Sequence, residues 1–195
     1  MRIKLLILAL LIGFMITGSA FAEEEELFFT YIGPTLGAGT NQIAYRRWSQ
    51  SSDSRESSVV SGYFISGGFL LNIYVRNFIG EFALEYMADQ NSKESDISVM
   101  HLIYTSQAKY SYSLNDMFSL TCGLGAYLET PPSTKRFDSG GGIAGSFGFI
   151  IDFNREFKLV VDTPVCRYGY FGVGDDSSKL SFGVKIGMVY KVGRI

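Results

Sequence analysis

The sequence has little of the charge that a soluble domain of its size usually carries. Asp, Glu, Lys and Arg make up 18% of its 195 residues, against roughly a quarter in an average soluble domain. Basic residues do not outnumber acidic ones, which excludes an ordinary nucleic-acid-binding surface, and a single histidine gives poor support for a zinc site. Glycine, with 22 residues, and aromatics, at 15%, are abundant instead. This combination is typical of a protein with one lipid-facing surface.

The first residues are typical of a secretory signal peptide. Arg2 and Lys4 precede an apolar run over 5–16, and a small-x-small cleavage sequence follows at 20–22. A retained membrane anchor is the alternative, but the apolar run is shorter than the roughly 20 residues that a spanning helix needs. We therefore expect residues 1–22 to be removed.

The rest of the chain is predicted to be a single exported domain. Residues 23–27 form an acidic tail before a domain over 28–195, and loss of two of the 17 basic residues leaves 15 against 19 acidic ones, a net charge of −4. Cys122 and Cys166 allow a disulfide in an exported protein, but the pattern described below puts them on opposite faces of different strands. We expect free thiols, with the disulfide as the alternative.

Large apolar residues alternate with small or polar ones over eight segments, which predicts eight β-strands. The predicted strands span 28–45, 59–75, 78–88, 97–112, 118–128, 142–153, 157–167 and 180–192. Long polar connections at 46–58, 89–96, 130–139 and 169–178 alternate with very short ones at 76–77, 113–117 and 154–156. This order is typical of an all-β, eight-stranded antiparallel up-and-down transmembrane β-barrel, with short turns on one side of the membrane and long loops on the other.

The composition of the two faces indicates which one meets lipid. A soluble barrel also alternates but carries charges outside, whereas the apolar face has no formal charge along the second to sixth predicted strands and only Arg167 at the end of the seventh. The opposite face suits the narrow, filled lumen of an eight-stranded barrel. There we expect a charge network in which acids and bases neutralise one another, made of Glu81, Glu85, Lys109, Asp152, Lys158, Asp162, Lys185 and Lys191. Acid-base chemistry by the paired glutamates is the alternative.

Aromatic residues gather where the predicted strands meet the short turns, as at a membrane interface. They are Tyr31, Phe78, Tyr110, Tyr112, Phe118, Phe153, Phe157 and Tyr190. Trp48, in the first long connection, is interpreted as a marker of the opposite interface. Ordinary packing in a soluble sheet is the alternative.

The last strand carries the most specific motif of the chain. Lys185, Gly187, Tyr190 and Val192 are spaced as polar-x-Gly-x-x-hydrophobic-x-hydrophobic. Through this motif and the eight predicted strands the chain resembles the small outer-membrane barrels of the OmpA transmembrane domain, OmpX and opacity-protein group. The resemblance implies that the motif is an insertion signal, although the chain runs on through 193–195 where the family usually ends on an aromatic residue. It also implies a monomer in the bacterial outer membrane, without a cofactor, whose partners are membrane lipid, lipopolysaccharide, the outer-membrane assembly machinery and periplasmic chaperones.

A structural or surface-interaction role follows from this interpretation, with a side-chain-filled lumen and loops that contact lipopolysaccharide or environmental molecules. Two alternatives stay open. Pro164 interrupts a predicted strand, which favours an OmpW-like channel for small hydrophobic solutes. His101 lies near the outer end of another strand, where a lipid A-modifying enzyme would need its catalytic histidine, but no serine stands two residues later. We interpret it as a lumen or rim residue.

Overall fold

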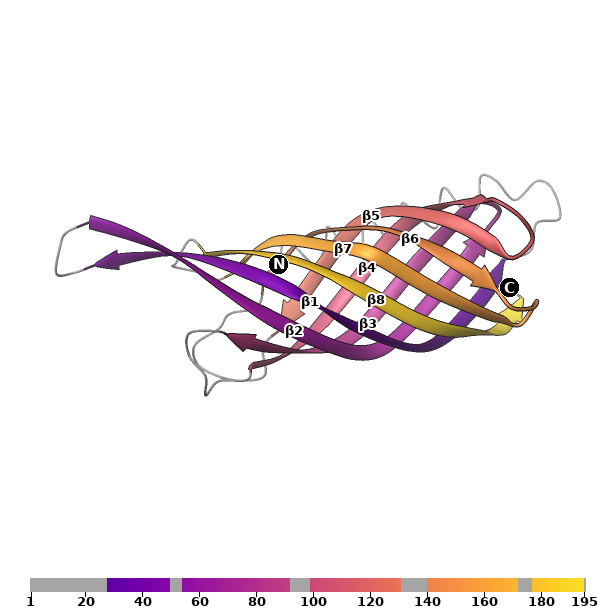
Figure 1. Cartoon of the computed structure of the whole chain (residues 1–195), viewed down its shortest axis with the longest axis horizontal. Coiled ribbons are helices and arrows are strands. Elements are labelled where there is room, and N and C mark those ends of the chain that lie inside the picture. The colour runs from indigo at the N-terminus through magenta and orange to yellow at the C-terminus, as the bar shows by residue number, and fades with distance from the viewer. Residues whose placement is uncertain (1–27, 50–53, 92–98, 131–139, 172–176, 195) are drawn as a thin grey trace.

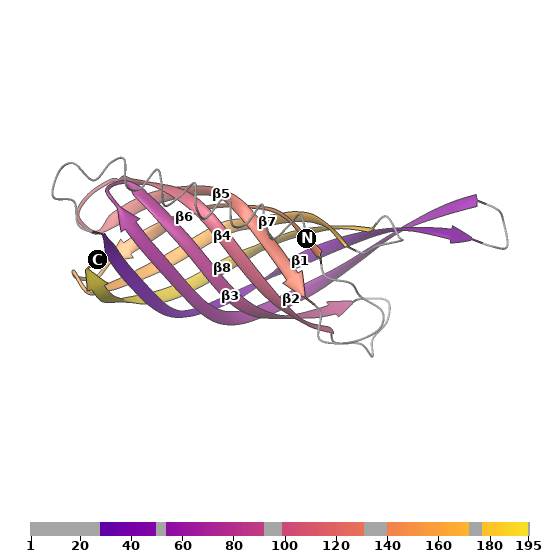
Figure 2. The same cartoon turned by 180° about the vertical axis from the view of Figure 1, so that it is seen from behind.

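The chain forms a closed barrel of eight antiparallel strands, as predicted (Figure 1). The computed structural model describes residues 28–49, 54–91, 99–130, 140–171 and 177–194, so the predicted signal peptide and acidic tail lie outside it. Each strand pairs with the next in sequence, and β1 pairs with β8 to close the wall (Figure 2). The strands are β1 (Phe29–Ser49), β2 (Ser54–Val75), β3 (Phe78–Asn91), β4 (Val99–Ser113), β5 (Phe118–Thr130), β6 (Gly140–Asp152), β7 (Phe157–Phe171) and β8 (Ser177–Arg194). The described ranges contain no helix with the length and hydropathy of a membrane span.

Three tight turns join strands at one end of the barrel, where the sequence predicts them. Arg76 and Asn77 form the first, and Arg76 adopts a φ of 53°, the left-handed conformation that two-residue hairpin turns require. In the other two turns the side-chain oxygens of Asn115 and Asn154 each accept two backbone N–H groups at 2.8 to 2.9 Å. These side-chain oxygens thus provide acceptors for backbone N–H groups at the ends of the strand ladders.

At the opposite end two strands run further than predicted. β1 pairs with β8 only as far as Ala44, and β2 pairs with β3 only from Gly62 onward. Residues 45–49 and 54–58 pair with each other and with no further strand of the described chain, and this two-stranded ribbon projects past the barrel wall (Figure 1). The predicted loop over 46–58 is wrong in the part that the structure describes. The prediction followed the alternation of apolar residues, which ends where the strands no longer border the barrel core. Backbone pairing between β1 and β2 continues beyond that point.

A bulge in β7 changes the direction of the residues that follow it. The registers of β7 with β6 and with β8 both shift here, and Thr163 and Pro164 have no partner in either ladder. As a result Val165 and Arg167 are buried in the lumen, whereas the alternation predicts them outside. The inward placement predicted for Cys166 is wrong for the same reason. Pro164 lies where its missing N–H costs no ladder bond.

Both cysteines are free thiols. Cys122 lies on β5 and Cys166 on β7, and β6 separates these strands in the wall. The predicted absence of a disulfide holds, but intervening β6, not opposite faces, keeps the cysteines apart.

Candidate functional site

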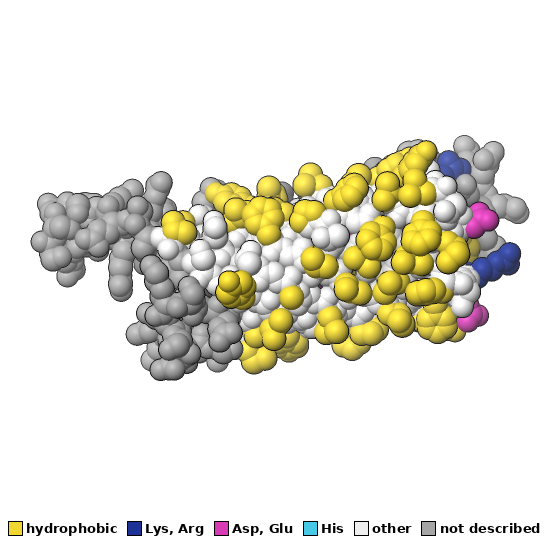
Figure 3. Space-filling model, viewed as in Figure 1, with side chains coloured by type: hydrophobic (Ala, Val, Ile, Leu, Met, Phe, Trp, Pro, Cys, Tyr) yellow, Lys and Arg dark blue, Asp and Glu magenta, His cyan; other side chains and the backbone are white. Residues whose placement is uncertain are grey.

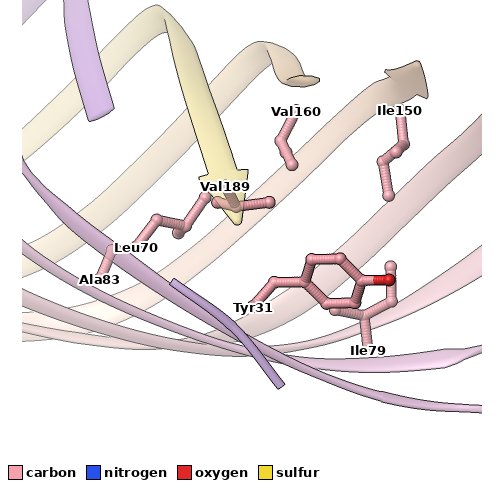
Figure 4. Close-up of a cluster of buried hydrophobic side chains, with 7 residues drawn as sticks. All are labelled: Tyr31, Leu70, Ile79, Ala83, Ile150, Val160 and Val189. Atoms are coloured by element: carbon pink, nitrogen blue, oxygen red, sulfur yellow. The ribbon is translucent and has the colours of Figure 1, made fainter. Parts of the chain in front are cut away.

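The lumen is filled by alternating apolar and charged layers. Along β3, starting from the tight turn, the buried inward residues are Ile79, Glu81, Ala83, Glu85 and Met87. A first apolar cluster lies at the tight-turn side (Figure 4) and contains Tyr31, Leu70, Ile79, Ala83, Ile150, Val160 and Val189. A second lies nearer the outer end and contains Phe64, Met87, Ile103, Tyr127 and Ala144. Charged groups between and beyond these clusters are thus shielded from water.

Four charged side chains form a closed ring between the apolar clusters. Lys109 Nζ lies 2.5 Å from Glu81 Oε2 and 2.7 Å from Asp162 Oδ2. Lys185 Nζ lies 2.5 Å from Glu81 Oε1 and 3.3 Å from Asp162 Oδ2. All four residues are at most 3% exposed. Each base touches both acids, so the ring is neutral and ties β3 and β4 to β7 and β8 across the lumen.

Two further ion clusters lie toward the outer end. Arg167 pairs with Glu85, whose Oε1 also accepts a hydrogen bond from Ser66 Oγ at 3.0 Å. Glu129 Oε1 lies 2.8 Å from Lys179 Nζ and 3.0 Å from His101 Nδ1. Sequence reasoning listed Glu85 but missed Arg167, Glu129 and Lys179. Glu129 lies two positions from Tyr127, and Lys179 lies two positions from Ser181. Because alternate residues of a strand share a face, the alternation already predicts that both side chains point into the lumen.

The remaining predicted members lie at the tight-turn end of the lumen. Asp152 pairs with Lys158, and Lys158 Nζ lies 5.2 and 5.1 Å from the ring centroids of Tyr31 and Tyr74. Lys191 Nζ lies 3.8 Å from the ring centroid of Phe29. Tyr31 is buried, so its predicted place in the outer aromatic belt is wrong. It instead helps close this mouth of the barrel, and its hydroxyl donates to the carbonyl of Arg155 at 3.1 Å.

Inward glycines make room for these large side chains. A Cβ on Gly123 would lie 2.4 Å from Lys109 Cγ, which is closer than van der Waals contact allows. Register partners Gly39 and Gly183 leave similar room for the ring of Phe64, because added Cβ atoms would lie 2.8 and 2.7 Å from it. The glycine-rich inner face thus reflects packing around long side chains.

One small cavity in the lumen lies beside an ion pair. A cavity of about 10 Å³ lies beside Ser66, Glu85 and Arg167, which is room for about one water molecule. The described residues contain no group of three or more His, Cys, Asp and Glu side chains placed to hold a metal ion. With acids and bases paired, the arrangement is suited to sealing and stabilising the wall.

The outer surface of the barrel wall differs from the lumen in its charge. Every described Lys, Arg, Asp or Glu side chain lies either on an inward strand position or in a tight turn. Figure 3 shows apolar side chains over the wall and charged ones at the end of the barrel where the turns lie. Large residues such as Leu36, Phe69 and Leu124 are 62 to 70% exposed. An apolar surface of this extent is unusual for a soluble monomer.

No family model and no curated protein matches this chain. Similar solved structures include Neisserial surface protein A, with 17% identity, 80% of this chain and 96% of that chain covered, and a TM-score of 0.41. The outer membrane protein OprG of Pseudomonas aeruginosa is 15% identical over 86% of this chain and 96% of its own, with a TM-score of 0.37. The attachment invasion locus protein Ail of Yersinia pestis, solved with the heparin analogue sucrose octasulfate, is 16% identical over 84% and 99%, with a TM-score of 0.36.

Proposed function

We propose that the chain is an integral protein of a bacterial outer membrane with a sealed lumen and a structural or surface-interaction role. The observation that carries this proposal is the separation of charge. The outward wall positions with described side chains are free of charge, while buried acids and bases are paired inside. Burying this many charges is costly even when they are paired, and a wall that faces lipid gives the reason for keeping them inside, because its outer face must be apolar. The expected signal peptide fits export to that membrane.

The dimensions of the wall support a membrane location. On β4 the outward positions from Met100 to Tyr112 cover 12 residue steps, and strands at about 3.3 Å per residue tilted by about 40° rise roughly 30 Å over that length. This matches the hydrocarbon core of a bilayer. Exposed aromatics at the tight-turn end, including the contacting pairs Phe78–Tyr110 and Phe157–Tyr190, lie where an interface belt belongs.

This proposal is tested by fractionation and conductance together. We expect the protein in the outer-membrane fraction, with a gel mobility that changes on heating, and no stable current when it is reconstituted in planar bilayers. A soluble periplasmic protein would contradict the membrane location. A steady current would contradict the sealed lumen alone.

Transport of small hydrophobic solutes is the second candidate, because the β7 bulge leaves Thr163 and Pro164 unpaired at an exposed place in the wall. Behind the bulge, however, Asp162 and Lys185 fill the lumen as part of the neutral ring. Uptake of a hydrophobic dye into vesicles containing the protein separates the two candidates. Dye uptake that is abolished by restoring a regular strand at 163–164 would favour transport.

Lipid A modification has less support. His101 is buried and shares Glu129 with Lys179, an arrangement that an internal ion cluster explains. Mass spectrometry of lipid A from cells with and without the protein tests this directly. We expect identical spectra.

Lipopolysaccharide, the assembly machinery and periplasmic chaperones are the partners that this role requires. In the proposed insertion signal, Tyr190 and Val192 are exposed on the wall, while Lys185 and Gly187 face the lumen. The apolar half of the motif is thus accessible from outside. Replacing Tyr190 by Ala is expected to lower the fraction of heat-modifiable barrel in cells.

A further inference from the structure

The mouth of the barrel at the tight-turn end contains a lysine that pairs with none of the described carboxylates. Lys191 has the inward parity of buried Val189 and is half-buried itself. Its ammonium group lies 3.8 Å from the ring centroid of Phe29. The other described lysines each pair with a carboxylate: Lys109, Lys158, Lys179 and Lys185. An ammonium group with reduced hydration is stabilised by a nearby negative charge, which the described residues do not supply to Lys191.

A second ammonium group lies at the same mouth. Lys158 pairs with Asp152, and the two side chains are 15% and 24% exposed, so this pair borders the solution. Lys158 Nζ also lies 5.2 Å from the ring centroid of Tyr31, two residues along β1 from the phenylalanine beneath Lys191. These lumen-facing groups thus comprise two ammonium groups and one carboxylate, an excess of one positive charge.

The chain enters its first strand at this mouth. Phe29, the first residue of β1, packs against the first apolar cluster and lies beneath the ammonium group of Lys191. Residues 23–26 are four consecutive glutamates, and Glu26 precedes Phe29 by three positions. Three residues span at most roughly 11 Å. The covalent chain therefore holds carboxylates close to Lys191, at a high effective concentration.

Other sources of negative charge fit this mouth less well. Phosphates of the surrounding lipid lie on the outer side of the wall, whereas Lys191 has inward parity. The tail of a second copy has to compete with a tail that is already tethered beside Lys191, and a tethered group binds at the higher effective concentration. The acidic tail of the same chain is therefore the best occupant.

We propose that the acidic tail, residues 23–26, docks across the tight-turn mouth of its own barrel and places carboxylates on the ammonium groups of Lys191 and Lys158. The docked tail neutralises the excess positive charge and covers this end of the lumen. The proposal deepens the proposed sealed lumen, and it rests on the proposed function because the tail is a free segment only after export and removal of residues 1–22.

Carbodiimide cross-linking tests the contact directly, because the reagent condenses a carboxylate with an amine only where the two groups meet. The barrel over 23–195 is treated in lipid nanodiscs, digested and analysed by mass spectrometry. We expect amide links within one chain from residues 23–26 to Lys191 or Lys158. The Asp152–Lys158 pair is an internal positive control. The yield of the tail links should fall severalfold at 1 M salt, where the Debye length is about 3 Å.

Proteolysis of the tail gives a second readout. A glutamate-specific protease should cut residues 23–26 more slowly in the docked tail than in a free one. Lys191→Gln should speed this cleavage by about two- to fivefold, the effect of losing one partly exposed ion pair. Lys191→Arg keeps the charge and should retain the protection. Arg155→Gln, which removes an exposed cation from a neighbouring turn, should leave the rate unchanged.

Heat-modifiable migration shows that the barrel of each variant is folded, and fractionation is scored separately, so failure of the proposed function is distinguished from failure of the docking proposal. A sample that forms the Asp152–Lys158 link but no tail link overturns the docking proposal. Tail links found only between two chains overturn it as well, because the tail would then occupy another copy. Equal cleavage rates for the wild type and Lys191→Gln, or equal acceleration by Arg155→Gln, would show that Lys191 does not hold the tail.

Discussion

Glu81 and Asp162 each accept contacts from two lysine ammonium groups, so neither acid can be removed without leaving charge in the lumen. Exposure of at most 1% for both side chains means that water cannot replace a lost partner. The ring therefore contributes as a unit and not as four separate ion pairs.

Replacing Glu81 by Gln should lower the free energy of unfolding by about 3 to 5 kcal/mol, because it leaves an uncompensated positive charge in a dry interior. Urea titration in vesicles, followed by the heat-modifiable gel shift, measures this change. Adding Lys185→Gln restores neutrality and should recover a large part of the loss. If the Glu81→Gln and Glu85→Gln double variant keeps wild-type stability and conductance, the network does not hold the lumen together.

Replacing Gly123 by Ala should destabilise the barrel by about 1 to 3 kcal/mol, because the new methyl overlaps the stem of Lys109. Gly145→Ala is the matched control, since a Cβ there would meet its nearest atoms at 3.6 to 3.8 Å on the outer side of the wall. The same urea titration compares the two. Equal stability of both variants would show that the lumen relaxes around the added methyl.

For single residues, the sequence predicts which side chains face the lumen better than it predicts which of them form ion pairs. Alternation places Glu81, Lys109 and Lys185 inside, but the cross-lumen contacts depend on barrel stagger, which no local pattern encodes. Arg167 was assigned to the wrong face because the bulge before it changes parity.

Among the elements, the tight turns show the most regular local chemistry. Asn115 and Asn154 stand three residues before Phe118 and Phe157, and each side chain bonds the N–H of that phenylalanine and of the residue before it. The repeated turn fixes where β5 and β7 begin.

Asn115→Ala and Asn154→Ala should each cost about 1 to 2 kcal/mol, since two donors lose their acceptor in a partly solvated turn. The turns are separate, so the double variant should show roughly the sum. Asn→Asp variants retain the acceptor oxygen and serve as controls. Aspartate variants as unstable as the alanine ones would indicate that the amide nitrogen matters instead.

Strand starts at 78, 118 and 157 were predicted correctly because turn residues mark them locally. The outer ends of β1 and β2 were not, because a two-stranded ribbon beyond the barrel core packs no face against that core and needs no apolar alternation. Pro164 indicated the interruption in β7. The sequence does not show how many residues of the strand the bulge leaves unpaired, and this number decides which face the following side chains take.

For the molecule as a whole, the apolar wall distinguishes a membrane barrel from a soluble one. Leu124 lies at the middle of β5 and is 68% exposed, and Leu114 lies in a tight turn and is 57% exposed. In water these two positions would be equivalent. In a bilayer they lie at different depths.

Leu124→Arg should therefore lower stability in vesicles by about 2 to 4 kcal/mol, and Leu114→Arg by about 0 to 1 kcal/mol. Refolding each variant into lipid vesicles and measuring the folded fraction against denaturant gives both values. Similar values for the two positions would argue against a transmembrane wall.

The barrel itself was predicted from the sequence because eight alternating segments with alternating long and short connections leave few other arrangements. The number of strands and their neighbours follow from such local signals. The contacts across the lumen depend on closure of the barrel, which pairs β1 with β8 and brings side chains of β3 and β7 together. No single segment of the sequence shows this.

The neutral ring bears on how the wall can enter a membrane. Glu81 and Lys109 lie on neighbouring strands of one hairpin, while Asp162 and Lys185 are register partners in another. Each hairpin thus brings one acid and one base to the ring, so its two ring charges offset each other before the hairpins meet. The ring itself therefore adds no net charge to either hairpin when that hairpin enters lipid.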